Sequence, residues 1–519
     1  MQLSRLPVHP LLVAAYPILF LYGENLSEVG ADELWLPLVV SVVVAGLAYA
    51  ALSLLLRDRD RAAILVTAGL VAFFGFGHVR DAVGPLGLNP GPLLLSTGIA
   101  LAVVGVLVLR RRDGWAGVTR AANVVSAILV GLAIATIATG GLGVSASGPL
   151  DRPNPDGGTR TTERDIYYII LDRYASEHVL RTYFDVTAPA LYAELPGLGF
   201  TVIPDSQANY PRTIHSLASS LNLTYLDELA SAQGPDQAST RPMIEMLQDH
   251  AVGRFLKGKS YTYVHLGSWW DPTETNRIAD VNPRFESGSD FLATLNETTI
   301  LPELLGRLRR IGLPIGGGPV DNYVRHYEAG RFDFAHLDDL AAVPGPKFVF
   351  IHILLPHDPY VFDIDGSFVT PEERRSRSIN DSVARQLAYT DSQIGAFLRT
   401  LVAVPPDEQP IIVLQADEGP QPARYDKDEG GFRWDQATPA ELDQKFGILN
   451  AFFLPGDEAP LPYPGISPVN AFRLVLGAYF GADLPPLPDR HIVFRDRDHP
   501  YDLIDLTEAV KAARIANGG

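Results

Sequence analysis

Four long apolar runs in the first 140 residues constrain the fold more than any other feature of the sequence. None of them contains a charged side chain, and they cover residues 34–56, 62–78, 93–109 and 121–139. Each approaches the roughly 20 residues that an α-helix needs to cross the hydrocarbon core of a bilayer. Helices buried in a soluble core are the alternative, but so little polar sequence separates the runs that spanning helices are the better interpretation.

A shorter apolar run, residues 11–22, precedes these four and contains Pro17. It is either the core of a signal peptide or a first spanning helix. Only Arg5 flanks it and no small-residue cleavage site follows, which favours a helix that is retained. We therefore predict an α-helical transmembrane domain of about five helices over residues 1–140, followed by a linker rich in Gly, Ser, Pro and Asp over 141–164.

Arginine residues in the short loops predict how these helices are oriented. Counting all five predicted helices, they lie between the second and third, at Arg57, Arg59 and Arg61, and between the fourth and fifth, at Arg110, Arg111, Arg112 and Arg120. The first loop holds acidic residues and no basic one. Under the positive-inside rule the arginine-rich loops are cytoplasmic. The chain beyond Thr139 is then extracytoplasmic, whether or not the first segment is removed, and the protein is a multi-pass protein of the cell membrane.

Residues 165–519 have the composition of a soluble, acidic domain. The formal net charge of the chain is −18, and nearly all of the acidic excess falls after residue 150. This charge opposes nucleic acid as a partner, because the phosphate backbone would be repelled. The chain has no cysteine, which excludes disulfides, thiolate metal ligands and a cysteine nucleophile.

Apolar strands alternate with helices in this second part of the chain. Continuous apolar runs predict strands at 166–171, 261–266, 347–355, 410–415 and 446–454. Helical periodicity and capping residues predict helices at 213–229, 371–402 and 467–480. Strands that are apolar on both faces and separated by helices are typical of an α/β domain built around a mainly parallel central sheet.

Polar side chains follow three of the predicted strands. Asp172 ends "YYIILD", His357 comes just after "KFVFIHILL", and Asp417 and Glu418 end "IIVLQADEG". Because ligands of open α/β sheets bind beyond the carboxyl ends of the strands, these side chains are candidates for one site. Carboxylates that share a site need a cation. The alternative for each residue alone is an ordinary turn or loop position.

Thr213 is a further candidate, because it stands where a Ser-rich helix, "TIHSLASSLN", begins. It is either an N-cap, which satisfies a backbone amide of the first turn, or a nucleophile. The two roles are compatible, since the field at a helix N-terminus favours an alkoxide and an arriving anion.

In this order and at these strand ends, the residues resemble the alkaline-phosphatase/sulfatase superfamily. The chain looks most like its membrane-anchored branch, which includes lipoteichoic acid synthases and phosphoethanolamine transferases and joins a membrane domain to an extracytoplasmic α/β domain, here 165–519. The resemblance implies that Asp172 in "IILD" and Asp417 in "DEG" bind a metal. It also implies that Thr213 is both nucleophile and metal ligand, and that His357 in "PHDPY" is a catalytic residue near the phosphate.

Glu418 departs from the pattern of this family, which usually has histidine at that position. Glutamate can still bind a metal as a hard oxygen ligand. The predicted metal set of Asp172, Thr213, Asp417 and Glu418 therefore indicates one divalent ion, with Mn²⁺ or Mg²⁺ favoured over Zn²⁺. Arg173 and Arg212 are near enough in sequence to offset part of the negative charge.

The resemblance thus implies a membrane-anchored, metal-dependent phosphotransferase or sulfatase-like hydrolase, which acts on an envelope lipid or glycan phosphoester through Thr213. The expected partners are the lipid bilayer and this lipid-linked or glycan substrate. The alternative is a pseudoenzyme or binding module with a degenerate metal site, and a membrane scaffold without a site is a third possibility. Formylglycine-dependent sulfatase chemistry is disfavoured, because the chain has no cysteine and no serine in a Cys/Ser-x-Pro-x-Arg frame.

The orientation can be tested with a reporter enzyme that is active only after export. Fused after Gly141, the reporter is expected to be active. The arginine-rich loops are predicted to be cytoplasmic, so the C-terminal end of the last helix is predicted to be outside. Fused after Arg111, in a predicted cytoplasmic loop, it is expected to be inactive. Activity at Arg111 without activity at Gly141 would reverse the predicted topology.

Overall fold

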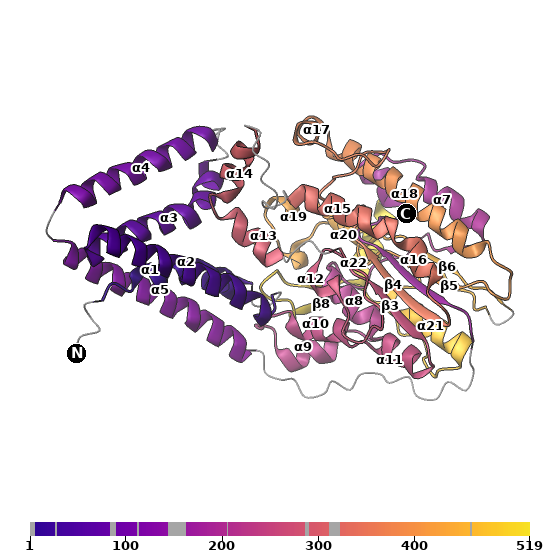
Figure 1. Ribbon diagram of the computed structural model, residues 1–519. Coiled ribbons are helices and arrows are strands. Elements are labelled where there is room, and N and C mark those ends of the chain that lie inside the picture. Colours follow the sequence, from indigo (N-terminus) through magenta and orange to yellow (C-terminus); the bar gives the residue numbers. More distant parts are fainter. Residues whose placement is uncertain are drawn as a thin grey trace. The chain divides into compact units, whose positions relative to one another are not determined.

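The computed structural model describes residues 6–25, 29–83, 90–111, 114–143, 162–204, 206–285, 290–310, 322–456 and 459–518. The chain forms two compact units, which are described separately. The helical unit comprises Met1–Val144 and Gly288–Asn322, and the α/β unit comprises Ser145–Ser287 and Tyr323–Gly519 (Figure 1). Most of the linker predicted over 141–164 lies outside the described residues.

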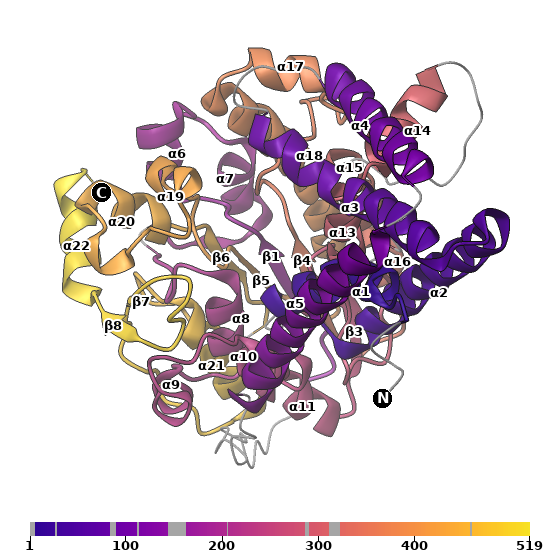
Figure 2. The ribbon, with the colours of Figure 1, turned by 90° about the vertical axis from the view of Figure 1, so that its left-hand side faces the viewer.

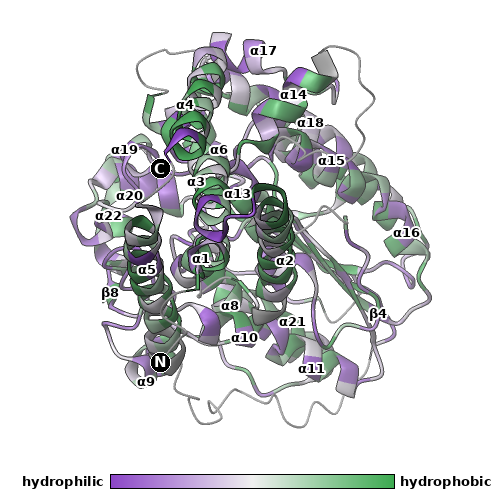
Figure 3. Ribbon diagram, turned by 60° about the vertical axis from the view of Figure 1, so that its left-hand side comes forward, coloured by the Kyte–Doolittle hydropathy of each residue, from purple (hydrophilic) through white to green (hydrophobic). Residues whose placement is uncertain are grey.

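The helical unit begins with five helices, as the apolar runs predict. They are α1 (His9–Glu24), α2 (Ala31–Leu56), α3 (Arg59–Val83), α4 (Pro90–Arg110) and α5 (Trp115–Gly143). Helices α2 to α5 are long and apolar enough to cross a membrane, whereas α1 has only 16 residues. Much of the surface of α2 and α4 is hydrophobic (Figure 3), and large apolar side chains such as Leu54 are exposed on it. Such a surface suits a hydrocarbon solvent.

Helix α1 packs against α2, α3 and α5. Its first turn is held by a side chain of α5: the Oδ1 atom of Asn123 accepts hydrogen bonds from the amides of Val8 (3.0 Å) and His9 (2.9 Å). The Nδ2 atom of the same side chain donates to the carbonyl of Leu6 at 2.9 Å. Asn123 therefore satisfies backbone groups that the start of a helix leaves without intrahelical partners.

Two further helices of this unit come from the middle of the chain. Helices α13 (Asp290–Glu297) and α14 (Leu301–Arg310) fall by sequence order within the predicted 165–519 domain. In the structure, α13 contacts α1 and α2, and Phe291 and Leu295 are buried in the apolar cluster of this unit. Their short amphipathic pattern does not distinguish, from sequence alone, a helix that packs on a soluble sheet from one that packs on membrane helices.

The α/β unit is built on a six-stranded sheet in the order β2-β6-β5-β1-β4-β3. The strands are β1 (Ile166–Leu171), β2 (Thr201–Val202), β3 (Thr262–Leu266), β4 (Lys347–Ile353), β5 (Ile411–Gln415) and β6 (Asn450–Phe453). Strands β5, β1, β4 and β3 pair in parallel, whereas β6 pairs antiparallel with both of its neighbours, β5 and the edge strand β2. The predicted mainly parallel sheet is confirmed. A hairpin of β7 (Ile492–Phe494) and β8 (Leu503–Asp505) lies apart from it.

Helices cover both faces of this sheet (Figure 2). Alternate residues of β1 supply the two cores: Tyr167 and Ile169 belong to the core that includes α18, and Tyr168 and Ile170 to the core that includes α8 and α21. Strand residues point alternately to opposite faces, so a strand covered on both sides must be apolar throughout. This is why the sequence of β1 reads as a continuous apolar run.

The helices of the α/β unit are short, apart from α18. They are α6 (Glu177–Phe184), α7 (Ala190–Glu194), α8 (Thr213–Leu221), α9 (Asp227–Gln233), α10 (Arg241–Gln248), α11 (Ala251–Gly258), α12 (Asp271–Glu274), α15 (Asn322–Ala335), α16 (Leu337–Ala342), α17 (Pro371–Ser376), α18 (Ile379–Val402), α19 (Ala423–Lys427), α20 (Pro439–Phe446), α21 (Pro468–Phe480) and α22 (Thr507–Ala516). Two 3₁₀ turns, η3 (Leu195–Leu198) and η4 (Trp434–Gln436), complete the set in the described part of the unit.

Three predicted boundaries differ from the structure for local reasons. The helix predicted at 371–402 is two helices, because Arg377 is extended and Ser378 caps α18. The helix predicted at 213–229 is divided between α8 and α9. The strand predicted at 446–454 begins only at Asn450, since a capping box formed by Thr438 and Glu441 starts a helix that runs to Phe446.

Candidate active site

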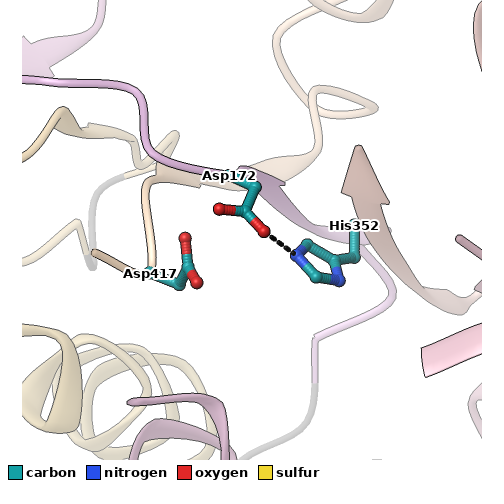
Figure 4. Close-up of side chains that lie close together, drawn as sticks. All are labelled: Asp172, His352 and Asp417. Atoms are coloured by element: carbon teal, nitrogen blue, oxygen red, sulfur yellow. Dashed lines mark ion pairs between the residues drawn. The ribbon is translucent and has the colours of Figure 1, made fainter. Parts of the chain in front are cut away.

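Three neighbouring parallel strands bring three polar side chains together at one edge of the sheet. Asp172 follows β1 and Asp417 follows β5. His352 is the last residue but one of β4. Because β1 lies between β5 and β4, the carboxylate of Asp172 stands between the other two side chains (Figure 4). All three residues are buried, and each offers a ligand atom within 4.8 Å of the others. The group could bind a metal ion.

The atoms that face this space have no hydrogen-bond partner in the described part of the chain. They are Oδ1 of Asp172, Oδ2 of Asp417 and Nε2 of His352. The other ring nitrogen of His352, Nδ1, is 2.9 Å from the hydroxyl of Thr273, and Nε2 is 3.5 Å from Oδ2 of Asp172. Buried polar atoms left without partners are costly. A divalent cation would satisfy all three, with Thr273 holding the imidazole in position as outer partners of metal-bound histidines do.

Burial shifts the pKa values of Asp172 and Asp417 in the same direction, but the charged groups around them shift these pKa values in opposite directions. For both groups the largest influence is desolvation, which raises a carboxyl pKa. The pKa of Asp172 is nevertheless lowered below its ordinary value, because His357, His352 and Arg173 lie close to it. The pKa of Asp417 is raised well above its ordinary value, since Asp172 and Glu418 add negative charge to the effect of burial. A bound cation would displace a proton from this pair.

Glu418, the second acid of the sequence pair, is also buried but has a different set of neighbours. Its Oε1 atom is 2.9 Å from Nζ of Lys445 and 3.2 Å from Nε of Arg173. Lys445 is fully buried and also donates to the carbonyl of Gly419 at 2.8 Å. Burial lowers the pKa of Lys445, an effect that Glu418 opposes. Two cations therefore engage one carboxylate oxygen of Glu418, while Oε2 has no partner among the described residues.

Thr213 is the first residue of α8 rather than its N-cap. The cap position belongs to Arg212, which makes no side-chain capping bond. The hydroxyl of Thr213 instead hydrogen-bonds to Asp417, which opposes the raised pKa of that carboxyl. Ser216, one turn further along α8, donates to the carbonyl of Asp417 at 2.6 Å and so ties the helix to the end of β5. The predicted nucleophile is thus held beside one of the candidate ligands.

A pocket of about 530 Å³ opens over these residues. Its floor includes Asp172, Arg173, Thr213 and Glu418, and its lining includes Trp269, Trp270, Tyr360, Arg212 and His357. The ring of His357 lies edge-on to Trp269 with centroids 6.1 Å apart, and its Nδ1 is 3.6 Å from Oδ1 of Asp358. Asp358 in turn pairs with Arg173 at 2.5 Å. His357 therefore lines the pocket, outside the group of three ligands.

The sequence reasoning singled out His357 and gave no role to His352, five residues earlier. His352 is the one histidine within the apolar run of β4, and it is fully buried between β1 and β3 in the sheet. A polar side chain inside a strand that is otherwise apolar was the available signal. The pattern by itself does not separate a ligand from a histidine satisfied in the core, because only the sheet order brings residue 352 beside residue 172.

No protein-family model matches the chain, and no curated protein sequence matches it. Solved structures of the alkaline-phosphatase superfamily are similar to it. One is the periplasmic domain of EptC from Escherichia coli in complex with Zn, with 12% identity over 66% of this chain and 93% of that one, and a TM-score of 0.40. Another is the integral membrane protein lipooligosaccharide phosphoethanolamine transferase A from Neisseria meningitidis, with 14% identity over 91% and 94% of the two chains and a TM-score of 0.38.

A third is a superfamily protein from Vibrio parahaemolyticus, with 12% identity over 68% of this chain and 79% of that one, and a TM-score of 0.39. This third protein is described as a member of the superfamily that the sequence motifs resemble. Scores of this size do not carry an activity from one protein to another, so the function of the present site depends on its own residues.

Replacing one member of the Glu418–Lys445 pair tests whether the pair is structural. Lys445→Met is expected to lower the free energy of unfolding by about 3 kcal/mol, because it leaves a buried carboxylate poorly paired. The double variant Glu418→Gln/Lys445→Met should recover most of this loss in urea denaturation. Lys257→Met is a matched control, since Lys257 makes a half-exposed pair with Asp280 and should lose only about 1 kcal/mol or less. Equal losses in the single and double variants would show that Glu418 does not depend on Lys445.

Proposed function

We propose that this protein is a membrane-anchored, metal-dependent phosphotransferase or phosphoester hydrolase, with its α/β unit outside the cytoplasm. One observation carries the proposal: the buried side chains of Asp172, His352 and Asp417 each offer a ligand atom within 4.8 Å of the others, and Asp172 lines a pocket together with Thr213. The expected substrate is a phosphoester of an envelope lipid or glycan. The arginine-rich loops and the four membrane-capable helices support the location.

The residues that would hold the metal are Asp172, His352 and Asp417, with Thr213 as the ligand that reacts. Glu418 was expected to be a fourth ligand, and only its Oε2 atom is left for that role. A divalent ion bound there would lower the pKa of the Thr213 hydroxyl and neutralise negative charge on a phosphoryl group. Mn²⁺ is expected to bind best. The two carboxylates favour Mn²⁺ and Mg²⁺ over Zn²⁺, whereas the imidazole of His352 disfavours Mg²⁺ and makes Zn²⁺ a stronger competitor.

The charges around the pocket suit an anionic substrate. The acidic groups Asp172, Asp417 and Glu418 would repel a phosphate if they stood alone. Arg173 and Lys445 supply two positive charges at Glu418, so a bound divalent ion would leave the floor close to neutral even with Thr213 ionised. Besides Arg212 and His357, the rest of the lining includes the acidic residues Asp358, Asp426 and Glu429. A phosphoryl group that reaches the floor could therefore approach Thr213 without facing a net negative charge there.

In the proposed reaction the Oγ1 atom of Thr213 attacks phosphorus, and its proton passes to Asp417, which accepts a hydrogen bond from it. The bond from phosphorus to the leaving oxygen breaks on the opposite side, and His357 donates a proton to that oxygen. The product of this half-reaction is a phosphothreonine ester. An alcohol or water then attacks phosphorus and gives its proton to His357. The bond from phosphorus to Oγ1 of Thr213 breaks, and Thr213 takes back its proton from Asp417, which completes a transfer or a hydrolysis.

A binding module without turnover is the second candidate, and the Glu418–Lys445 pair favours it. In that pair an ammonium group contributes positive charge that a metal ion could otherwise supply. The pocket, with Trp269, Trp270 and Tyr360 in its lining, would then recognise an envelope ligand. The two candidates differ in whether the wild-type protein binds a divalent metal and turns over a phosphodiester.

Thr213→Ala is expected to abolish turnover of a soluble phosphodiester such as bis-p-nitrophenyl phosphate and to leave the fold intact. The hydroxyl makes no capping bond, so the stability change should stay near 1 kcal/mol. Thr213→Ser keeps the nucleophile and should retain measurable activity. Phosphate incorporation into the wild type, followed by mass spectrometry of the peptide, checks the covalent step. Near-normal turnover by Thr213→Ala would refute the mechanism.

Metal binding is tested by calorimetric titration of Mn²⁺, Mg²⁺ and Zn²⁺ into the purified full-length protein. Asp172→Asn and His352→Gln are each expected to weaken Mn²⁺ binding at least tenfold, which is about 1.4 kcal/mol, because each removes a ligand. His357→Gln should leave metal affinity unchanged while it lowers turnover, since His357 lies outside the ligand group. Wild type that binds none of the three ions at millimolar concentration would support the binding module instead.

A further inference from the structure

Residues 298–300 of the chain dock directly on the backbone of membrane-capable helix α3. The amide of Gly77 donates to the carbonyl of Thr298 at 2.9 Å, and the carbonyl of Phe73 accepts from the amide of Ile300 at 2.9 Å. Residues 73 and 77 are four apart, so they are the pair that an uninterrupted α-helix would bond to each other. The segment thus engages a donor and an acceptor of a single helical turn.

This contact requires glycine at position 77. A Cβ atom there would lie 2.2 Å from the carbonyl oxygen of Glu297 and 2.7 Å from the Cα of Thr298. Gly69 and Gly75 of the same helix would meet nothing within 4 Å. Two backbones can approach this closely only where the residue at the contact is glycine, because any other residue carries a Cβ atom. Helices α13 and α14 on either side of this contact are therefore a fixed part of the helical unit.

The docked segment completes an apolar groove of about 560 Å³ inside the helical unit. The walls come from α2 between Pro37 and Leu52, from α3 between Val66 and Phe74, and from Leu292 and Leu295 of α13. Small residues hollow the groove: Ser41, Ala45, Ala48 and Gly69. The hydroxyl of Ser41 donates within the protein, to the carbonyl of Ala14 at 2.9 Å. The hydroxyl of Thr299 likewise donates within the protein, to the carbonyl of Asn296 at 2.7 Å, and Asn296 is the remaining polar residue of a lining that is otherwise apolar. Such a lining suits a hydrocarbon ligand better than a polar one.

The dimensions of the groove suit one extended aliphatic chain. From Pro37 to Leu52, α2 rises about 22 Å at 1.5 Å per residue. The hydrocarbon core of a bilayer is about 30 Å thick, so this length exceeds the depth of one leaflet. Val40 and Val44, which line the groove, are 51% and 58% exposed. The solvent at the surface of a membrane-capable helix is lipid, and an acyl chain can enter from it.

We propose that the groove between α2, α3 and α13 is a binding site for a single acyl chain of a bilayer phospholipid. The proposal concerns the helical unit alone and holds whether or not the α/β unit turns over a phosphoester. If it is correct, the protein retains a lipid at a site shaped by a segment from the middle of its chain. This would favour a lipid over a glycan as the substrate class of the proposed reaction.

Gly69→Leu tests the site, because the new side chain would grow into the empty groove without striking backbone. Gly75→Leu is the matched control: it is on the same helix, also meets nothing within 4 Å, and is outside the groove lining. The full-length protein is reconstituted in phosphatidylglycerol vesicles that contain phosphatidylglycerol with a diazirine on one acyl chain. After irradiation, lipid-modified peptides covering 37–52 and 66–74 are measured by mass spectrometry.

Cross-linking at these peptides is expected to fall about tenfold in Gly69→Leu, because the added volume excludes the chain, and to stay at the wild-type level in Gly75→Leu. Gly77→Leu, which must displace residues 297–298, should also reduce it. Equal cross-linking in the wild type and Gly69→Leu would overturn the proposal and indicate ordinary surrounding lipid only. Efficient oxidation of Gly69→Cys, the only cysteine in that variant, to a disulfide-linked dimer would overturn it in favour of a second copy of the chain.

Discussion

Three carboxylates buried at the edge of one sheet need positive charge nearby, and the arrangement of the α/β unit meets this need in two ways. Lys445 and Arg173 engage Glu418 directly, with N–O distances of 2.9 and 3.2 Å. Asp172 has His352, His357 and a share of Arg173 close to it, Asp417 has a share of Lys445, and each aspartate keeps a buried oxygen without a hydrogen-bond partner in the described chain. A buried charge that lacks a partner is costly. The positive charge still needed beside Asp172 and Asp417 is the reason to expect a divalent cation in the space between them.

The two acids of the "DEG" turn therefore do different work, although they are adjacent in sequence. Asp417 faces Asp172, His352 and the hydroxyl of Thr213, whereas Glu418 faces a lysine from α20 and the arginine that follows β1. Consecutive residues at a strand end project in different directions, and each meets whatever the neighbouring elements provide. The interpretation of Glu418 as a substitute ligand drew on its position in a motif. Its contacts show that Oε1 also holds Lys445 and Arg173 beside the pocket, and the role of Glu418 as a ligand stays a prediction that rests on its Oε2 atom.

The helical unit shows a similar dependence on one contact. Its membrane-capable helices are evident in the sequence, but the groove among them exists because residues 290–310 pack on α1, α2 and α3. Gly77 permits this packing, since any side chain there would strike residues 297–298. A glycine in an apolar helix has no sequence signal that separates such a contact from a neutral position: Gly69, Gly75 and Gly77 look alike in the sequence and have different surroundings in the structure.

By itself, the sequence determined the class of each part, and it predicted three of the residues that the candidate site brings together. Apolar runs of spanning length predicted the helices, apolar strands separated by helices predicted the parallel sheet, and acids at strand ends predicted Asp172 and Asp417 together with Thr213. These features are local, so period and composition reveal them. Tertiary structure alone decided that His352 joins Asp172, that Lys445 pairs with Glu418, and that residues 290–310 belong with the helices near the N-terminus. Those partners are separated by 27 positions, for Glu418 and Lys445, to 269 positions, for Tyr22 and Phe291, and only strand order and packing bring such residues together.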